Sequence, residues 1–199
     1  MPVFSHRLAW FALLVSVLVA CGQAGPQFKN VDITGADFGK DFQLYDHTGK
    51  VRQMADFRGK VVVLFFGYTH CPDVCPTTMG ELALVMKELG NDAGQVQVLF
   101  VTLDPERDTQ ALLAQYVPAF NPAFLGLYGD AAATLLTAKA FRIFYEKQPG
   151  KTPDSYTLDH TAASYVFDRE GRLRLFVRYG QNGSDLVKDI RQLLAANQR

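Results

Sequence analysis

The chain has 199 residues, of which 48% are hydrophobic and 20% are charged, and its 20 basic and 20 acidic side chains give a formal net charge of zero. This composition is typical of one globular domain and excludes a disordered or collagen-like chain. The balanced charge excludes a broad basic surface, so we expect no nucleic-acid partner. A domain of this size buries a sufficient core without disulfides, and its three cysteines therefore need another explanation.

The first twenty residues predict a signal peptide. Arg7 precedes an apolar stretch from Leu8 to Ala20, which is shorter than the roughly 20 residues that a membrane-spanning helix needs. The stretch ends in Leu-Val-Ala followed by Cys21, which resembles the bacterial lipobox, where the cysteine receives a lipid and becomes the new N-terminus. An uncleaved anchor with a chance cysteine is the alternative. We therefore expect a signal peptide over residues 1–20 and a lipoprotein in the cell envelope, outside the cytoplasmic membrane.

Residues 21–40 are rich in glycine and polar side chains and lack a long apolar pattern. A segment of this composition is expected to be a tether. With a lipid on Cys21, the tether would hold the following domain, residues 41–199, near a membrane surface and facing the periplasm.

From residue 42 onward, strand-like and helix-like patterns alternate. Residues 42–46 and 51–54 flank a turn with Gly49 and predict a hairpin. The other expected elements are a buried strand at 61–67, a helix at 76–89, a strand at 96–103, a helix capped by Asp108 or Thr109 and ending near Pro118, a helix at 131–141, an exposed loop at 147–156, paired strands at 163–168 and 173–179, and a last helix capped by Ser184. This order predicts an α/β domain with helices packed on a central mixed sheet.

The segment Cys71-Pro-Asp-Val-Cys75 follows the buried strand and precedes a helix. If Pro76 takes the first helical position, Cys75 is the N-cap and both sulfurs lie near the positive end of the helix dipole. This position lowers the pKa of a thiol and favours the thiolate, which attacks disulfides and binds soft metals such as Cu(I) or zinc. A structural disulfide or a pair of buried thiols is the alternative, although closing so short a loop adds little stability.

The histidines differ as candidate third ligands. His47 is predicted to lie in an exposed turn, and His70 is a minor candidate because its side chain should point away from the neighbouring cysteine. His160 reaches the cysteines if the strand at 163–168 neighbours the strand at 61–67. A histidine that is hydrogen-bonded within its own loop is the alternative for His160.

Three further features have a simple structural interpretation. The acidic residues between Asp104 and Asp108 lie between a strand and a helix, where they are expected to form a turn and cap the helix. Asp73 is expected to face solvent. Met79 and Met86 lie on the predicted core face of one helix, which favours packing over copper binding by thioethers.

Five segments in this order resemble the Sco/SenC family of copper-binding, thioredoxin-like proteins that help to assemble the copper centres of cytochrome c oxidase. They are FFGYTHCPDVCPTTM at 65–79, TLDPERDT at 102–109, YVPAF at 116–120, LDHTAASYVFDREG at 158–171 and YGQN at 179–182. Together with the strand FRGKVVVLFFG, they cover nearly all of residues 40–197.

The resemblance implies a thioredoxin-like fold with an added N-terminal β-hairpin. It also implies that Cys71, Cys75 and His160 bind one copper ion, Cu(I) or Cu(II). Thioredoxins carry a cis-proline opposite their cysteines, whereas this chain has Asp159-His160-Thr161 at the matching position. An imidazole facing two thiolates favours metal binding. Asp159 is expected either to orient His160 or to cap its loop.

The function implied by the resemblance is a metallochaperone that delivers copper to the CuA-bearing subunit of cytochrome c oxidase. Other periplasmic copper carriers or thiol reductases are further expected partners. A thiol–disulfide oxidoreductase that keeps the copper-site cysteines of the oxidase reduced is the alternative, and it would need Cys71 and Cys75 but not His160. A peroxidase is disfavoured because Thr69 lies too close to Cys71 for a Thr-x-x-Cys motif.

Overall fold

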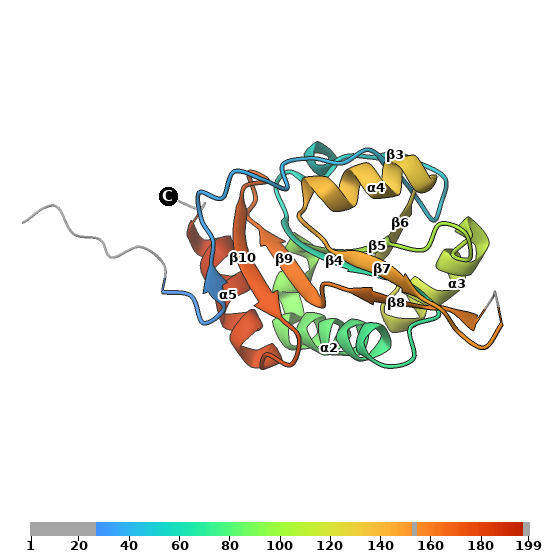
Figure 1. Ribbon diagram of the computed structural model, residues 1–199. Coiled ribbons are helices and arrows are strands. Elements are labelled where there is room, and N and C mark those ends of the chain that lie inside the picture. Colours follow the sequence, from blue (N-terminus) through green and yellow to red (C-terminus); the bar gives the residue numbers. More distant parts are fainter. Residues whose placement is uncertain (1–26, 153–154, 197–199) are drawn as a thin grey trace, which may run out of the picture.

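The structure is a computed structural model that describes residues 27–152 and 155–196; the expected signal peptide and Cys21 lie outside the described residues. Its main feature is an eight-stranded mixed sheet with the strand order β1-β10-β9-β4-β5-β6-β2-β3 (Figure 1). The strands of this sheet are β1 (Val31–Asp32), β2 (Leu44–Asp46), β3 (Val51–Arg52), β4 (Val61–Gly67), β5 (Val96–Thr102), β6 (Leu125–Tyr128), β9 (Ala163–Phe167) and β10 (Leu173–Arg178). The α/β class predicted from the sequence is confirmed.

Helices cover both faces of the sheet. They are α2 (Val74–Leu89), α3 (Gln110–Phe120), α4 (Ala131–Ala140) and α5 (Gly183–Ala196), with 3-10 turns η1 (Met54–Phe57) and η2 (Gly90–Gln95). Figure 1 shows α4 on one face and α2 and α5 on the other. Because β4 and β5 run in parallel between these layers, every position of both strands is buried. Alternate side chains serve the two layers: Phe65 packs against Phe100, and Phe66 against Phe141, which follows α4.

Strand pairing brings distant parts of the chain to one edge of the sheet. β9 runs antiparallel to β4, with Phe65 opposite Ser164. The carboxyl end of β4, which leads to the cysteines, therefore lies beside the amino end of β9, which follows His160. The strands at 163–168 and 61–67 are thus neighbours, which is the arrangement that His160 needs in order to reach the cysteines.

A second, two-stranded sheet was not predicted. It pairs β7 (Tyr145–Gln148) with β8 (Thr157–His160) in antiparallel register, so that Tyr145 lies opposite His160. The loop expected at 147–156 is thus the tip of a hairpin, which we call the β7–β8 hairpin. Strand β6 was also missed, because it has only four residues and one of them is Gly126, which is uncommon in strand interiors and here lies close to the side chain of Val117.

Three helix ends differ from the prediction. Helix α3 continues past Pro118 to Phe120, and Thr109 caps its start by accepting a hydrogen bond from the Leu112 N–H at 3.2 Å. Helix α5 is capped by Asn182 instead of Ser184, since the Asn182 side chain accepts from the Ser184 N–H at 3.0 Å. The start of α2, the third, bears on the cysteines and is described below.

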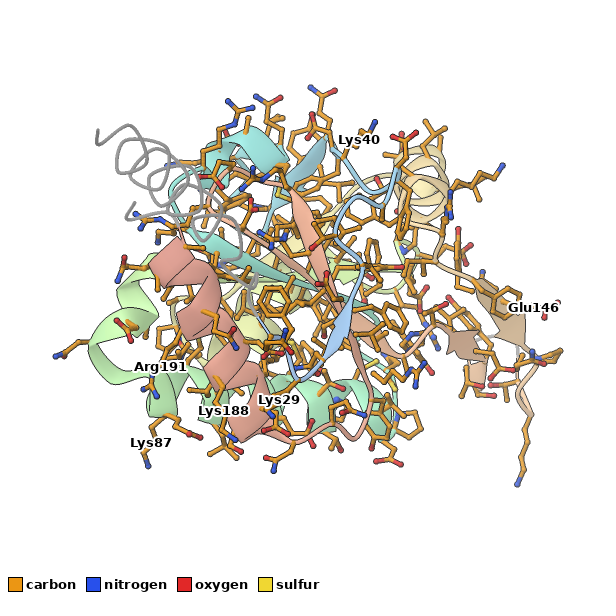
Figure 2. All side chains as sticks on the ribbon, turned by 90° about the vertical axis from the view of Figure 1, so that its left-hand side faces the viewer. Lys29, Lys40, Lys87, Glu146, Lys188 and Arg191 are labelled. Carbon is orange, nitrogen blue, oxygen red and sulfur yellow. The ribbon has the colours of Figure 1, made fainter. Side chains whose placement is uncertain are left out.

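The segment expected to be a tether packs on the domain from about residue 28. Strand β1 pairs with β10, and both carboxylate oxygens of buried Asp189 on α5 accept backbone N–H groups, from Lys29 and Asn30, each at 2.8 Å. Figure 2 shows Lys29 beside α5, near Lys188. The packed part of the chain thus begins well before residue 41. A buried carboxylate needs hydrogen-bond donors, and the N–H groups of Lys29 and Asn30 supply them to Asp189. Within the described residues, no helix combines the length and apolarity required to span a membrane.

Candidate metal centre

The turn between β4 and the start of α2 positions Cys71 and Cys75. Helix α2 begins at Val74 with Asp73 as its N-cap, so Cys75 is the second helical residue and the expectation that it is the N-cap was wrong. Pro76 is tolerated at the third helical position, two later than expected, because no N–H of the first turn has an intrahelical partner. One of these free N–H groups, that of Cys75, points at Cys71 Sγ from 3.4 Å. The helix terminus therefore stabilises negative charge on Cys71.

The two sulfurs lie in different environments. Cys71 is half-buried and Cys75 is fully buried, and they are not joined by a disulfide. A hydrogen bond from the Cys75 thiol lowers the pKa of Cys71 to about 5, against the effect of burial, with help from the N–H groups of Asp73 and Cys75. The hydrogen bond that the Cys75 thiol donates to Cys71 and burial raise the pKa of Cys75, and the negative charge on Cys71 adds to this. At neutral pH, the pair therefore holds one thiolate, on Cys71, and one thiol.

His160 lies at the end of β8 and faces the cysteines. Its Nε2 atom is 3.4 Å from Cys75 Sγ, and its Nδ1 atom is 3.1 Å from the carbonyl oxygen of Thr161. A carbonyl only accepts, so Nδ1 carries the proton and Nε2 presents its lone pair toward the sulfurs. The rings of Phe65 and Tyr68 pack edge-on against the imidazole, at centroid distances of 6.3 and 5.9 Å. The ring is thus oriented for a ligand at Nε2.

Together, these three side chains form a group that could hold a metal ion. The Sγ atoms of Cys71 and Cys75 and a ring nitrogen of His160 all lie within 4.8 Å of one another. Ligand distances of about 2.3 Å for sulfur and about 2.0 Å for nitrogen allow such atoms to reach a common ion after small rotations. Two sulfurs and one imidazole favour soft or borderline ions such as Cu(I) and zinc, and disfavour magnesium or calcium.

The other candidate residues lie outside this group. His70 is exposed and bonds to Thr69 Oγ1 at 3.0 Å, and His47 accepts from the Gly126 N–H at 3.0 Å. Asp159 is exposed and lies on the opposite side of β8 from His160. The Thr161 carbonyl therefore supplies the orienting contact for which Asp159 was considered.

Two other expectations concern residues near the group. Asp73 is exposed and Met79 and Met86 are buried in the core, all as expected. The acidic segment before α3 does more than was predicted, because its Asp108 is fully buried next to the cysteine turn. One carboxylate oxygen accepts from Thr102 Oγ1 at 2.6 Å and from the Thr69 N–H at 3.0 Å. Asp108 therefore fixes the backbone two residues before Cys71, a role that only its spatial neighbours reveal.

The fold and the site define a class: a thioredoxin-like domain whose cysteine pair faces a histidine. A family model described as SCO1/SenC matches residues 31–195. The chain belongs to the SCO1/SenC family.

Curated relatives agree with this assignment. A bovine protein named "Protein SCO2 homolog, mitochondrial" is 36% identical over 200 residues, covering 92% of this chain and 75% of that protein. Its human counterpart is 35% identical over 158 residues, which cover 78% of this chain and 59% of the human protein. The chain thus spans well under two thirds of the human relative.

Solved structures share the fold. Bradyrhizobium japonicum ScoI with copper bound has a TM-score of 0.73 at 39% identity, covering 79% of this chain and 99% of that chain. The apo Sco1 protein of Thermus thermophilus has a TM-score of 0.75 at 38% identity, covering 87% and 100%. Yeast Sco1 with copper bound has a TM-score of 0.72 at 30% identity, covering 79% and 88%. These likenesses confirm the thioredoxin-like fold.

Proposed function

We propose that this protein is a copper carrier that binds one copper ion as cargo through Cys71, Cys75 and His160 and delivers it for assembly of the CuA centre of cytochrome c oxidase. The observation that carries the proposal is the position of His160 Nε2, 3.4 Å from Cys75 Sγ, within a compact group of two sulfurs and one nitrogen. Two relatives of similar fold are named with copper bound. The partner is the CuA-bearing subunit of the oxidase.

The unequal environments of the two sulfurs suit a carrier. Cu(I) prefers thiolate and imidazole donors, and its binding displaces the remaining proton from Cys75. Cys75 is fully buried and Cys71 is partly exposed. An incoming ligand of a partner protein therefore meets the metal from the side of Cys71, which allows transfer by stepwise exchange of ligands.

A competition titration tests the proposal. The reduced domain is titrated with Cu(I) against a coloured chelator, as wild type and as Cys71→Ser, Cys75→Ser and His160→Ala. We expect one ion per chain in the wild type and an affinity at least about tenfold lower in each variant. His47→Ala, a histidine far from the group in sequence and bonded to Gly126, is the matched control. No uptake by the wild type, or equal affinity in His160→Ala, contradicts the proposal.

The second candidate function is thiol–disulfide exchange, favoured by the unequal acidity of the cysteines. The Cys71 thiolate would attack a disulfide of the oxidase subunit, and the Cys75 thiol would resolve the mixed disulfide. One S–S bond forms between Cys71 and Cys75, and the partner's S–S bond breaks as it accepts two electrons. Of the two protons that the partner's thiols take up, one comes from Cys75 and one from solvent. His160→Ala separates the two functions, because exchange survives this change while copper affinity falls.

The N-terminal region is proposed to place this domain in the cell envelope. A signal peptide over residues 1–20, lipidation of Cys21 and a short tether would anchor the carrier on the periplasmic side of the membrane. Radiolabelled palmitate supplied to expressing cells tests this. Incorporation that is lost in Cys21→Ser supports the anchor, and a wild-type chain without label contradicts it.

A further inference from the structure

The β7–β8 hairpin, which carries His160, has no strand pairing with the main sheet. Its two strands pair only with each other among the described residues. Figure 2 shows the hairpin, marked by Glu146, projecting from the side of the molecule. An isolated two-stranded hairpin is marginally stable in water. Contacts with the rest of the domain must therefore fix where His160 points.

Where the chain enters β8, at the opposite end of the strand from His160, the hairpin contacts the loop between β5 and α3. The Tyr156 hydroxyl donates to Asp104 Oδ1 at 2.6 Å, and Arg107 Nε donates to Asp104 Oδ2, also at 2.6 Å. Arg107 also donates from a terminal guanidinium nitrogen to the Tyr156 carbonyl at 2.9 Å, and its guanidinium stacks 3.5 Å from the centroid of the Tyr156 ring. Two hydrogen bonds and a cation–π contact thus join the two segments, and the Arg107–Asp104 bond within the loop holds both partners of Tyr156 in place.

These contacts are protected from water. The side chains of Asp104 and Arg107 are only 1% and 15% exposed. Burial and the Asp104 carboxylate raise the pKa of Tyr156, which keeps its hydroxyl protonated and able to donate. Hydrogen bonds to charged groups in such surroundings are stronger than those on the surface. An exposed ion pair between Lys147 and Glu106, at 2.7 Å, joins the same two segments but adds little.

Asp104 and Arg107 do not cap helix α3, so capping does not account for the positions of their side chains. Thr109 is the N-cap of that helix, so the Asp104 and Arg107 side chains are available for the hairpin. From Tyr156, the connection to the metal centre is short. Two residues later, the Leu158 N–H donates to the buried Tyr68 hydroxyl at 3.1 Å, and the Tyr68 ring packs against His160.

We propose that Asp104, Arg107 and Tyr156 form a latch that holds the β7–β8 hairpin, and with it His160, against the two cysteines. The inference rests on the proposed copper-carrier function and adds a control point to it. When the latch is closed, the imidazole completes the metal site. When the latch opens, the hairpin carries His160 away and leaves the ion on two sulfurs, which favours release to a partner. The three latch residues are positioning residues, because none of them touches the metal-binding group.

The latch is tested with variants that remove one contact each. Tyr156→Phe deletes the hydroxyl bond to Asp104 and keeps the ring, while Arg107→Ala removes the guanidinium. Tyr128→Phe is the matched control, since it deletes a tyrosine hydroxyl bond to Gln110 away from the hairpin. We expect Cu(I) affinity to fall about tenfold in Arg107→Ala and less in Tyr156→Phe, with Tyr128→Phe unchanged.

Two further readouts separate a latch from general destabilisation. In a His160→Ala background, Arg107→Ala should leave Cu(I) affinity unchanged, because the latch acts only through the imidazole. In the protein without metal, nuclear Overhauser contacts between the His160 and Tyr68 rings should weaken in Arg107→Ala and persist in Tyr128→Phe.

The possible outcomes are distinct. A tenfold loss in Arg107→Ala that persists in the His160→Ala background overturns the latch, as does full affinity in Arg107→Ala with unchanged ring contacts. If the wild type binds no Cu(I), the proposed function fails, and the ring contacts alone then decide whether the latch holds His160.

Discussion

At the scale of single residues, the two cysteines of this protein are chemically unequal. Cys71 accepts a hydrogen bond from the Cys75 thiol and N–H groups of the α2 terminus, which lower its pKa to about 5 although burial opposes this. We predict that iodoacetamide modifies Cys71 and spares buried Cys75 at pH 7, and that the rate falls as the pH drops through about 5, where the thiolate is lost. Peptide mapping by mass spectrometry across pH measures both.

The Cys75→Ala variant is the control for this prediction. It removes the thiol that contributes most to the low pKa of Cys71. The midpoint of Cys71 alkylation should therefore move up toward the ordinary thiol range of about 8.5. Equal labelling of both cysteines in the wild type, or a midpoint already in the ordinary range, would contradict the assignment of the thiolate to Cys71.

At the scale of secondary-structure elements, β4 and α2 meet closely at Gly67. A Cβ atom there would lie 2.9 Å from Cys75 Sγ and 3.0 Å from the rings of Phe65 and Phe100. We predict that Gly67→Ala lowers the free energy of unfolding by about 1–3 kcal/mol and weakens Cu(I) binding, because it displaces the buried sulfur. Urea unfolding and the chelator titration measure the two effects.

Gly80 supplies the matched control for this change. It lies within α2, and a Cβ atom there would meet nothing within 4 Å. Gly80→Ala should stabilise the protein by up to about 1 kcal/mol, because alanine favours the helix, and should leave Cu(I) affinity unchanged. The prediction fails if the two alanine variants behave alike.

The same scale shows what the sequence could predict. The long apolar runs of β4 and β5 and the 3.6-residue pattern of α2 were predicted because burial on both faces and helix periodicity leave a direct trace in the sequence. Strand β8 leaves none: its four residues, Thr157–His160, are mostly polar and pair outside the main sheet. The sequence therefore placed His160 in a loop. Its approach to the cysteines could be predicted only on the condition that the strand at 163–168 neighbours the strand at 61–67, or from the family resemblance.

The roles of some polar residues were also hidden. Asp104 and Asp108 occupy positions where turns and helix caps ordinarily explain an acidic side chain. Their partners Tyr156 and Thr69 lie 52 and 39 residues away in the chain. A single sequence contains no local signal for such long-range hydrogen bonds, so the supporting contacts of the site became visible only in the folded chain.

At the scale of the whole molecule, the N-terminal segment closes onto the C-terminal helix. The fully buried carboxylate of Asp189 accepts from the N–H groups of Lys29 and Asn30 and from the Asn30 side chain at 2.9 Å. We predict that a chain starting at residue 41 is less stable than one starting at residue 27, on the order of 3 kcal/mol, because it leaves a buried charge unpaired. Urea unfolding of both chains measures the difference.

The substitution Asp189→Ala should change the free energy of unfolding in opposite directions in the longer and the shorter chain. In the longer chain, the substitution removes the acceptor of three hydrogen bonds and should destabilise the protein. In the shorter chain, the same substitution removes an unpaired buried carboxylate and should recover part of the lost stability. If the chains that start at residues 27 and 41 are equally stable, the N-terminal contacts with Asp189 do not contribute and the prediction is wrong.

The stability of the whole fold should also depend on acid, through carboxylates buried at two turns. Burial alone would raise the pKa of Asp46, but hydrogen bonds from Thr48 and Arg52 outweigh it and lower the pKa to about 2. The pKa of Asp168 is also lowered: burial would raise it, but hydrogen bonds from Arg172 and Arg174 outweigh this effect. Since these folded-state values lie below the value of about 3.9 in the unfolded chain, the stabilisation is complete above pH 4 to 5 and is lost as the pH falls toward 2. For Asp46 the loss is about 2 kcal/mol. Urea unfolding from pH 6 to pH 2 should show this decline, and Asp46→Asn should lower stability at pH 6 and make the decline shallower. A parallel decline in wild type and variant would show that Asp46 does not contribute to it.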